Sequence, residues 1–435
     1  MTEFSQNVRT QYLVRHGHSQ ANQENLIVGH PEHGIHNYGL TPKGKEQAHA
    51  AASKLKLRIK NPIIFSSDFL RAKETAAIIQ EKLGCELKFL PEIRERNFGK
   101  LEFKKSSNYQ MVWDADASNP GKSIQKVESL LAIFNRISRA WEKNTSLANE
   151  REIIWVSHGD PLKVMQCFFF NLSLRCCHDI QTLQCGDLKV TKTRKPITIA
   201  AHRGNSSQFP ENTIPAFQSA WENKIPCVEF DFHFSKDHIP VISHDSNFER
   251  TGHNSKHIKD LLYSEIRKID VSREGSLKAA TFPPSLEEVL ELVRKNKIFA
   301  LAEMKTHLDL QSPLIQLLEH YRSNLQIMDF DLENLLYLKK QIPKLQFIWL
   351  IDSGKSLNQA LKVAVKEKIL ILNPNKDSLL ENLGFIKIAH KKGVLVYCWT
   401  VDSIQDAFLL IEGGVDLITT NVPLQMYNKF VDRDY

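Results

Sequence analysis

The chain has 435 residues and a mass of 49.9 kDa, which is enough for two or three domains of ordinary size. Apolar residues make up 42% and charged residues 25%, so the composition excludes collagen-like, low-complexity and disordered proteins. No apolar run reaches the roughly 18 residues of a membrane helix, and the first residues lack the apolar stretch of a signal peptide. We therefore expect a cytoplasmic protein without a transmembrane segment.

The net charge of +7 is unevenly distributed. Residues 1 to 194 carry 28 Lys and Arg against 20 Asp and Glu, a net charge of +8, whereas the remainder carries 29 against 30, or −1. Because the basic part contains no run of five or six basic residues, we expect small phosphorylated substrates and no nucleic acid. The 7 cysteines form no C-x-x-C spacing, and their odd number argues against a complete disulfide framework.

Residues 10 to 170 alternate between short apolar runs and helical patterns. One helix is expected to begin after Thr41 and another to end at Gly84. Strands that alternate with helices predict an α/β layered sheet. The strand-like runs are QYLVRHG from residue 11, IIFSS at 63 to 67 and EIIWVSHG at 152 to 159.

The same alternation restarts after residue 196. Eight strand-like runs in about 240 residues are the count of a (β/α)8 TIM barrel, whose active sites lie at the carboxyl ends of the strands. We place one domain at residues 8 to 190 and a second at 196 to 435, with the polar, basic, proline-terminated segment 186 to 196 as the boundary. The eight runs are ITIAAHRG, CVEFDFH, PVISHD, IFALAEMK, QFIWLI, ILILNPN, VLVYCWTV and VDLITTNVP.

Chemically active residues follow two strands of the first part. Arg15 and His16 end the first strand and His158 ends a later one, and the carboxyl ends of parallel strands meet at one sheet edge. Arg71 and Glu95 add a second guanidinium and a carboxylate. A neutral imidazole can attack phosphorus in line while guanidinium groups hold the charge on the other oxygens. The set suits phosphoryl transfer through a nucleophilic histidine, which requires no metal.

The first part resembles the histidine phosphatase superfamily, which includes the phosphoglycerate mutases. The resemblance implies a three-layer α/β/α domain without a cofactor. Mutases of the family tend to carry longer insertions in the region that corresponds to the segment between Gly99 and residue 123. Because this segment is short here, the sequence favours a phosphatase over a mutase. The motifs that carry the resemblance are RHGHSQAN, LTPKGKEQA at 40 to 48, SSDFLRAKETA at 66 to 76, EIRERNFG at 92 to 99 and VSHGD at 156 to 160.

The same resemblance implies roles for single residues. His16 would be the phosphorylated nucleophile, and Glu95 would protonate the leaving oxygen and later activate water. The pocket around the phosphate would be formed by Arg15, Ser19, Asn22, Arg71 and the second catalytic histidine, His158. We give no role to His30, His33, His36 and His49, which are expected to be loop or surface residues.

The second part carries a different set of groups. Glu229 and Asp231 are two residues apart, so on a strand they point to the same face, and Glu303 on another strand can join them. Three carboxylates without a thiolate make a site for a hard divalent cation, Mg²⁺ or Ca²⁺. His202 and His244 supply an acid and a base. The set suits metal-assisted cleavage of a phosphodiester.

This part resembles the glycerophosphodiester phosphodiesterase family over residues 198 to 423. The resemblance implies His202 and His244 as the acid/base pair, and Glu229, Asp231 and Glu303 as metal ligands. Arg203 and Lys305 would contact the phosphate, and Trp399 would pack against the substrate. The motifs are AHRG followed by PENT, VEFDFHFSKDHIPVISHD at 228 to 245, FPPSLEEVL at 282 to 290, AEMK at 302 to 305, VYCWTVD at 396 to 402 and GVDLITTNVP at 414 to 423.

The sequence leaves two points open. His238 stands where many relatives have a glycine, and 205 to 208 is polar, so the alcohol part of the diester is undetermined. Asp245 either orients His244 or makes a structural turn contact.

We predict a bifunctional phosphoric ester hydrolase that acts on glycerophosphodiesters and phosphomonoesters. One alternative is that one half, the first half rather than the second, is a non-catalytic sensor of a phosphorylated ligand. Another is that the basic half binds nucleic acid, in which case the affinity would depend steeply on the salt concentration.

Overall fold

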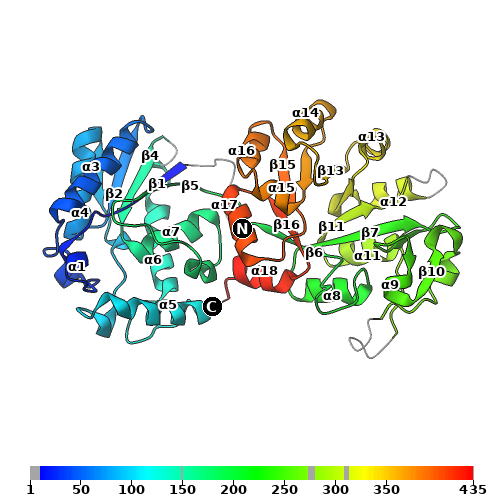
Figure 1. Cartoon of the computed structure of the whole chain (residues 1–435), viewed down its shortest axis with the longest axis horizontal. Coiled ribbons are helices and arrows are strands. Elements are labelled where there is room, and N and C mark those ends of the chain that lie inside the picture. Colours follow the sequence, from blue (N-terminus) through cyan, green and yellow to red (C-terminus); the bar gives the residue numbers. More distant parts are fainter. Residues whose placement is uncertain (1–9, 148–149, 273–279, 308–312, 435) are drawn as a thin grey trace. The chain divides into compact units, whose positions relative to one another are not determined.

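The structure is a computed structural model that describes residues 10–147, 150–272, 280–307 and 313–434. It divides into two compact domains (Figure 1). The first comprises Met1–Pro196 together with Lys429–Tyr435, and the second comprises Ile197–Asn428. The end of the chain therefore belongs to the first domain.

The first domain is built on a five-stranded sheet in the order β3-β2-β4-β1-β5. The first four of these strands are parallel, and β5 is antiparallel to β1. Arg15 of β1 lies opposite Ser157 of β4, so the residues that follow these two strands are neighbours at the carboxyl edge. The strands are β1 (Thr10–Arg15), β2 (Pro62–Ser66), β3 (Glu86–Phe89), β4 (Glu152–Ser157) and β5 (Leu188–Lys192).

Helices cover both faces of this sheet and complete the predicted three-layer arrangement. Ile154 and Val156 of β4 belong to a core cluster with apolar residues of α3 and α4. Trp155 points to the other face, where it packs against Trp141 of α6 and Phe169 of α7. The helices are α1 (Gln20–Gln23), α2 (Pro31–Gly34), α3 (Pro42–Lys56), α4 (Leu70–Leu83), α5 (Tyr109–Ser118), α6 (Leu130–Asn144) and α7 (Gly159–Phe170).

The predicted helix ends are confirmed, since Thr41 caps α3 and Gly84 ends α4 with a φ of 67°.

The two edge strands of this sheet, in contrast, were not expected from the sequence. The strand β5, however, lies inside the segment predicted as the domain boundary. Edge strands are exposed on more than one side, so they lack a continuous apolar run. In β5 the buried side chain is Thr191, and β3 has no buried residue.

The second domain is a closed barrel of eight parallel strands. The barrel closes where β11 pairs with β7, with Glu303 opposite Asp231. The predicted TIM barrel is confirmed. In barrel order, the strands are β6 (Thr198–His202), β7 (Cys227–Phe234), β11 (Phe299–Met304), β12 (Leu325–Asp329), β13 (Gln346–Ile351), β14 (Ile371–Pro374), β15 (Leu395–Cys398) and β16 (Leu417–Thr420).

One predicted barrel strand was wrong. The run PVISHD forms β8 (Pro240–Ile242), which is antiparallel to β7 and is not one of the eight barrel strands. A parallel crossover needs about a dozen residues, and the turn from Phe234 to Pro240 is shorter. His238 in this turn has a φ of 62°, the left-handed conformation that favours glycine. The missing barrel strand is β12, whose sequence LQIMD interrupts its apolar run with a glutamine.

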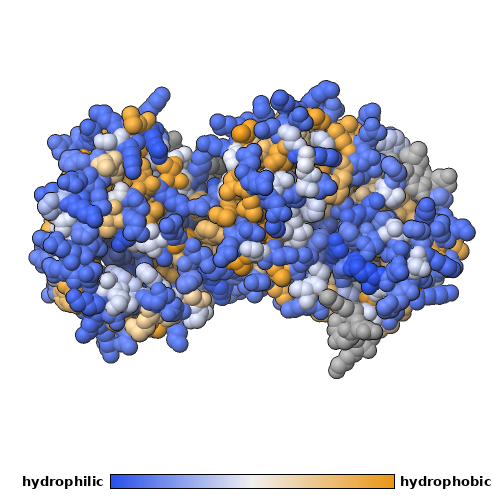
Figure 2. Space-filling model, in the orientation of Figure 1, coloured by the Kyte–Doolittle hydropathy of each residue, from blue (hydrophilic) through white to orange (hydrophobic). Residues whose placement is uncertain are grey.

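Helices surround the barrel, and the predicted capping box of Ser285 and Glu288 is present. No helix in the described part of the chain is long and apolar enough to cross a membrane, and hydrophilic residues cover much of the face seen in Figure 2. The longer helices are α8 (Ile214–Glu222), α11 (Leu286–Lys295), α12 (Leu314–Tyr321), α13 (Leu332–Gln341), α14 (Leu357–Glu367), α16 (Gly384–Lys391), α17 (Ile404–Gly413) and α18 (Pro423–Phe430), and the shorter ones are α9 (Glu249–Gly252), α10 (Tyr263–Ile266) and α15 (Lys376–Leu380).

Candidate active sites

The two predicted histidines of the first domain meet at the carboxyl edge of its sheet. His16 follows β1 and His158 follows β4, and their ring centroids are 5.0 Å apart. Arg71, on the first turn of α4, reaches the same place, and its Nε donates to Nε2 of His16 at 3.1 Å. All three side chains are buried. The adjacent parallel strands therefore bring together residues that are more than 50 positions apart in the chain.

The hydrogen bonds of His16 determine its tautomer. Nδ1 lies 2.7 Å from the carbonyl oxygen of Gly17, which can only accept, so Nδ1 carries the proton. Nε2 then has a free electron pair, which faces Arg71. Burial and the charges of Arg71 and Arg15 hold the pKa of His16 well below its ordinary value. The imidazole is therefore neutral, and its unprotonated nitrogen faces the cationic groups.

Within the described ranges, two buried guanidinium donors near His16 are unpaired. Arg15 Nη1 donates to Leu183 O at 2.7 Å, and Arg71 Nη2 donates to Val28 O at 2.9 Å. Among the described residues, the donors Arg15 Nε and Arg71 Nη1 have no hydrogen-bond partner, and neither does the ring nitrogen Nδ1 of His158. Unpaired buried donors are costly, so their presence beside a neutral imidazole is best explained by an anionic ligand.

Glu95 is the carboxylate of this group. Its Oε1 accepts a hydrogen bond of 2.9 Å from the backbone N–H of Arg96. Burial, and then the nearby charge of Asp160, raise its pKa to about 7, although Arg71 acts in the opposite direction. The side chain can therefore hold or release a proton near neutral pH, as a general acid must.

A buried ionic network next to Glu95 was not predicted. The Arg96 guanidinium binds both oxygens of Asp116, at 2.6 and 2.9 Å, and one oxygen of Asp160 at 3.2 Å. The other oxygen of Asp160 accepts from Trp113 Nε1 at 3.1 Å. Asp160 belongs to the motif VSHGD, but its link to the helix α5 through Trp113 has no signal in a single sequence.

Tyr109, also on α5, is a further unpredicted member of this site. Its ring stacks on that of Trp113, with centroids 5.5 Å apart and an interplanar angle of 8°. Burial, Glu95 and Asp160 raise the pKa of Tyr109, while Arg71 and Arg15 lower it. The hydroxyl therefore keeps its proton and lies among the charged groups of the pocket.

Ser19 and Asn22 form a capping box at the start of α1. The Ser19 hydroxyl donates to Asn22 Oδ1 at 2.9 Å, and the same oxygen accepts from the backbone of Ser19 at 3.0 Å. Both residues have a clear structural function, and their predicted place in a substrate pocket stays a prediction.

In the barrel, the three predicted carboxylates lie together. Glu229 and Asp231 on β7 and Glu303 on β11 are buried, and each offers an oxygen within 4.8 Å of the others. Burial and the other two carboxylates hold the pKa of Glu229 well above its ordinary value. Among the described residues, Asp231 Oδ1 accepts no hydrogen bond. Three crowded carboxylates without a sulfur donor fit a divalent cation that prefers oxygen ligands.

The predicted phosphate contacts border these carboxylates. Lys305 Nζ lies 2.6 Å from Glu303 Oε1 and 3.3 Å from Asp231 Oδ1. Arg203 Nε lies 3.4 Å from Asp231 Oδ2. Asp231 Oδ2 also accepts from Asn212 Nδ2 at 2.9 Å. The barrel site thus combines buried carboxylates with partly buried cationic groups.

His202 ends β6 beside the carboxylates, with Nε2 at 3.8 Å from Glu229 Oε2. Its other nitrogen, Nδ1, lies 2.6 Å from Asn421 Oδ1. The amide nitrogen of Asn421 donates to Asp402 Oδ2 at 2.8 Å. Burial and Arg203 lower the pKa of His202. Asn421 and Asp402 lie within the sequence motifs, but no role was predicted for them. In the structure Asn421 contacts His202 directly, and Asp402 contacts Asn421.

His244 follows β8 and completes the predicted set. Its Nδ1 lies 2.7 Å from Asp245 Oδ1, so Asp245 does contact the imidazole. Arg250 links Asp245 to Glu211: its Nε donates to Asp245 Oδ2 at 2.8 Å, and its Nη2 donates to Glu211 Oε1 at 2.7 Å. These residues line a surface pocket together with Asn212, Ile242, Ser243, Phe248, Thr251, Val271 and Pro283.

Trp399 follows β15, and its Nε1 donates to Asn373 O at 2.9 Å. The ring lies edge-on to that of Phe330, with centroids 5.6 Å apart. These contacts fix its orientation, and contact with a substrate stays a prediction.

Comparisons with known proteins agree with this division. The profile of the glycerophosphoryl diester phosphodiesterase family matches residues 202–425, and that of the histidine phosphatase superfamily (branch 1) matches residues 11–201. A glycerophosphodiester phosphodiesterase of Caldanaerobacter subterraneus is 31% identical over 237 residues, which are 53% of this chain and 96% of that protein. Glycerophosphodiester phosphodiesterase 1 of Homo sapiens is 34% identical over 127 residues, 28% of this chain and 38% of that protein.

Among solved structures, an Oleispira antarctica phosphodiesterase in complex with sn-glycerol-3-phosphate is 22% identical, with a TM-score of 0.49, and the match covers 53% of this chain and 96% of that one. The chain belongs to the glycerophosphoryl diester phosphodiesterase family and carries a histidine phosphatase domain before the family's barrel.

Proposed function

We propose that the barrel hydrolyses glycerophosphodiesters to glycerol 3-phosphate and an alcohol. The observation that carries the proposal is the buried cluster of Glu229, Asp231 and Glu303 beside His202. The similarity to glycerophosphodiester phosphodiesterases supports the same substrate class.

The three carboxylates would hold a divalent cation, Mg²⁺ or Ca²⁺, and the bound cation would withdraw charge from a phosphoryl oxygen. Arg203 and Lys305 would bind the remaining phosphoryl oxygens through charge-assisted hydrogen bonds. In the structure both already lie against the carboxylates, so the positive charges need little movement to reach a bound phosphate.

His202 and His244 would transfer the protons. Because Asn421 keeps the proton of His202 on Nδ1, its Nε2 can accept or return a proton at the reacting group. Asp245 supports His244 in the same way. One imidazole would take the proton of the attacking oxygen, and the other would give a proton to the leaving alkoxide.

The test is release of glycerol 3-phosphate from a set of glycerophosphodiesters by the full chain. H202A is expected to lower the rate by about three orders of magnitude, as for loss of a central catalytic group. H307A is the matched control, because His307 belongs to the same domain and its side chain is 94% exposed. Equal rates for H202A and the wild type would rule out the proposed reaction.

We infer that the first domain is a phosphomonoesterase. The supporting observation is the neutral His16, whose unprotonated Nε2 lies among unpaired buried donors. Nε2 would attack phosphorus, and Glu95 would protonate the leaving oxygen as the bond to phosphorus breaks. Glu95, now ionised, would take a proton from water, which attacks the phosphohistidine and restores His16. Arg15, Arg71 and His158 would stabilise the charge on the phosphoryl oxygens.

Its test is labelling of the full chain with a ³²P-labelled phosphomonoester, stopped in alkaline SDS so that a phosphohistidine survives. The wild type is expected to form an acid-labile phosphohistidine and to release inorganic phosphate, and H16A neither. H49A is the control, since His49 is exposed on α3. Ligand binding without labelling or release would favour the sensor function instead.

The two reactions fit in sequence. The diesterase leaves a phosphomonoester, glycerol 3-phosphate, which is the class of substrate that the first domain would dephosphorylate.

A further inference from the structure

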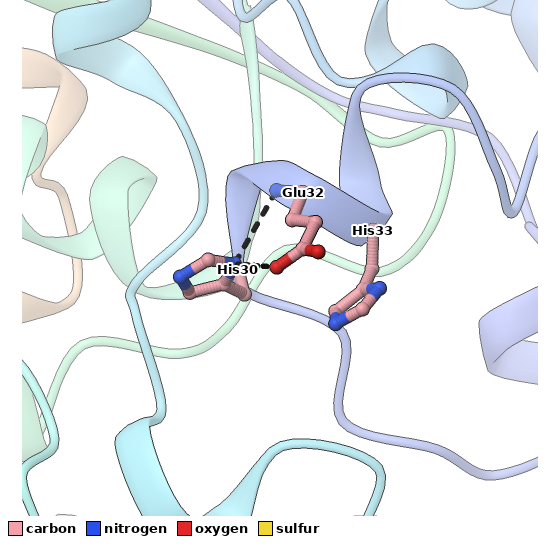
Figure 3. Close-up of side chains that lie close together, drawn as sticks. All are labelled: His30, Glu32 and His33. Atoms are coloured by element: carbon pink, nitrogen blue, oxygen red, sulfur yellow. Dashed lines mark hydrogen bonds and ion pairs between the residues drawn. The ribbon is translucent and has the colours of Figure 1, made fainter.

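A second group of metal-ligating side chains lies in the first domain. His30, Glu32 and His33 come from the short helix α2 and its N-cap, and each offers a ligand atom within 4.8 Å of the others. Figure 3 shows the carboxylate of Glu32 between the two imidazole rings. His30 Nδ1 lies 3.9 Å from Glu32 Oε2. None of these residues takes part in the proposed phosphohistidine chemistry.

The surroundings hold the two histidines in place. The backbone N–H of His30 donates to Glu102 Oε1 at 2.9 Å. Its Nδ1 accepts from the backbone of Glu32 at 3.3 Å, so this nitrogen carries an electron pair and not a proton. The ring of His33 packs against that of Phe103, with centroids 4.5 Å apart. Ligands held by neighbouring groups lose less conformational entropy when a metal binds.

The backbone of α2 is docked tightly on the side toward the phosphate pocket. A Cβ at Gly34 would meet the Phe69 ring at 2.4 Å, so the helix has no room to shift inward. Phe69 in turn lies edge-on to His158, at 5.3 Å, and its ring is 5.2 Å from the Arg71 guanidinium. Helix α2 therefore contacts the predicted pocket through Phe69.

We propose that His30, Glu32 and His33 bind one divalent transition-metal ion of the Zn²⁺ class. Two imidazoles and one carboxylate suit Zn²⁺, Co²⁺ or Ni²⁺, whereas Mg²⁺ and Ca²⁺ prefer sites made of oxygen ligands alone. Glu32 is exposed and the histidines are partly exposed, so small side-chain rotations bring the ligand atoms to bonds of about 2.0–2.2 Å, and water can fill the remaining positions. The ion would link the N-cap residue of α2 to its first turn.

The experiment measures Zn²⁺ binding to the full chain by equilibrium dialysis in excess Mg²⁺, which keeps the barrel carboxylates occupied. H33A is expected to bind about one equivalent less than the wild type, and E32Q to bind Zn²⁺ at least ~10-fold more weakly. H36A is the matched control, because His36 is an exposed histidine three residues further on, and it should bind like the wild type. Equal binding by H33A and the wild type would overturn the proposal.

A second measurement locates the ion. Carbethoxylation of histidines, read by peptide mass spectrometry, should be suppressed by Zn²⁺ at His30 and His33 but not at His36. Zn²⁺ should also raise the unfolding temperature of the wild type but not that of H33A, whose metal-free unfolding is expected to match the wild type. Unchanged labelling of His30 and His33 in the presence of Zn²⁺ would refute the assignment, whatever the outcome for the phosphatase reaction.

Discussion

Asn421 Oδ1 lies 2.6 Å from Nδ1 of His202, and this contact determines how the histidine presents its other nitrogen. Asp402 accepts hydrogen bonds from the side chain and the backbone of Asn421, at 2.8 Å each. A carboxylate accepts only, so the amide nitrogen of Asn421 faces Asp402 and its oxygen faces His202. The imidazole thus has one proton position fixed before any substrate binds.

Replacing this amide should impair the diesterase without removing its substrate contacts. We expect N421A to lower kcat for glycerophosphodiesters about 10–100-fold with little change in KM, as for loss of a group that orients a ligand. D402N should have a smaller effect in the same direction. Steady-state kinetics check this, and an unchanged kcat in N421A would show that Asn421 does not position His202.

The hydroxyl of Tyr109 is expected to act in the first site. Y109F keeps the ring that stacks on Trp113 and removes one protonated donor. Loss of a donor at the transferring phosphoryl group should reduce kcat/KM for a phosphomonoester about 100–1000-fold. Y38F serves as the control, because Tyr38 lies in the same domain outside the ionic network. Similar rates for Y109F and the wild type would exclude contact with the substrate.

The pH dependence of the phosphomonoesterase should report Glu95. Its pKa is raised to about 7, first by burial and then by Asp160. Only the protonated carboxyl can act as acid, so kcat should fall as the pH rises through about 7. In the variant D160N the charge that raises this pKa is absent, and the decline should move to lower pH.

The pH profile of D160N needs a control variant in which an acid outside the site is changed. The charges that face Glu95 are Arg71 from α4, Arg15 from β1 and Asp160 from α7, with the Tyr109 hydroxyl from α5. D114N changes an exposed acid on α5 and should leave the profile in place. A decline at the same pH in D160N and the wild type would mean that Asp160 has only a structural part, through Arg96 and Trp113.

Much of both sites could be predicted because their residues occupy strand ends in ordered motifs. His16 and His158 follow apolar strands, and parallel strands place such residues at one edge. Glu229 and Asp231 share a face because they are two residues apart on a strand. These relationships follow from backbone periodicity and sheet direction, which a single sequence reveals.

Other features depend on contacts that sequence order does not show. Asn421 is 219 positions from His202, and only closure of the barrel brings the two together. The pairing of Arg96 with Asp160 depends in the same way on tertiary packing. The predicted number of barrel strands was right, but one strand was wrongly included and one was missed. The run at 240 to 245 was wrongly included, because the turn before it is too short for a parallel crossover. The strand β12 was missed, because the buried polar residue Gln326 interrupts its apolar run.

We propose that this one chain has two phosphoester sites of different chemistry. The most direct test is to incubate a glycerophosphodiester with the full chain, with and without EDTA, and to measure both glycerol 3-phosphate and inorganic phosphate. We expect both products from the wild type, glycerol 3-phosphate alone from H16A and neither from H202A. EDTA should abolish diester cleavage and leave dephosphorylation of added glycerol 3-phosphate intact. Phosphate release that is unchanged in H16A, or diester cleavage that persists in EDTA, would contradict it.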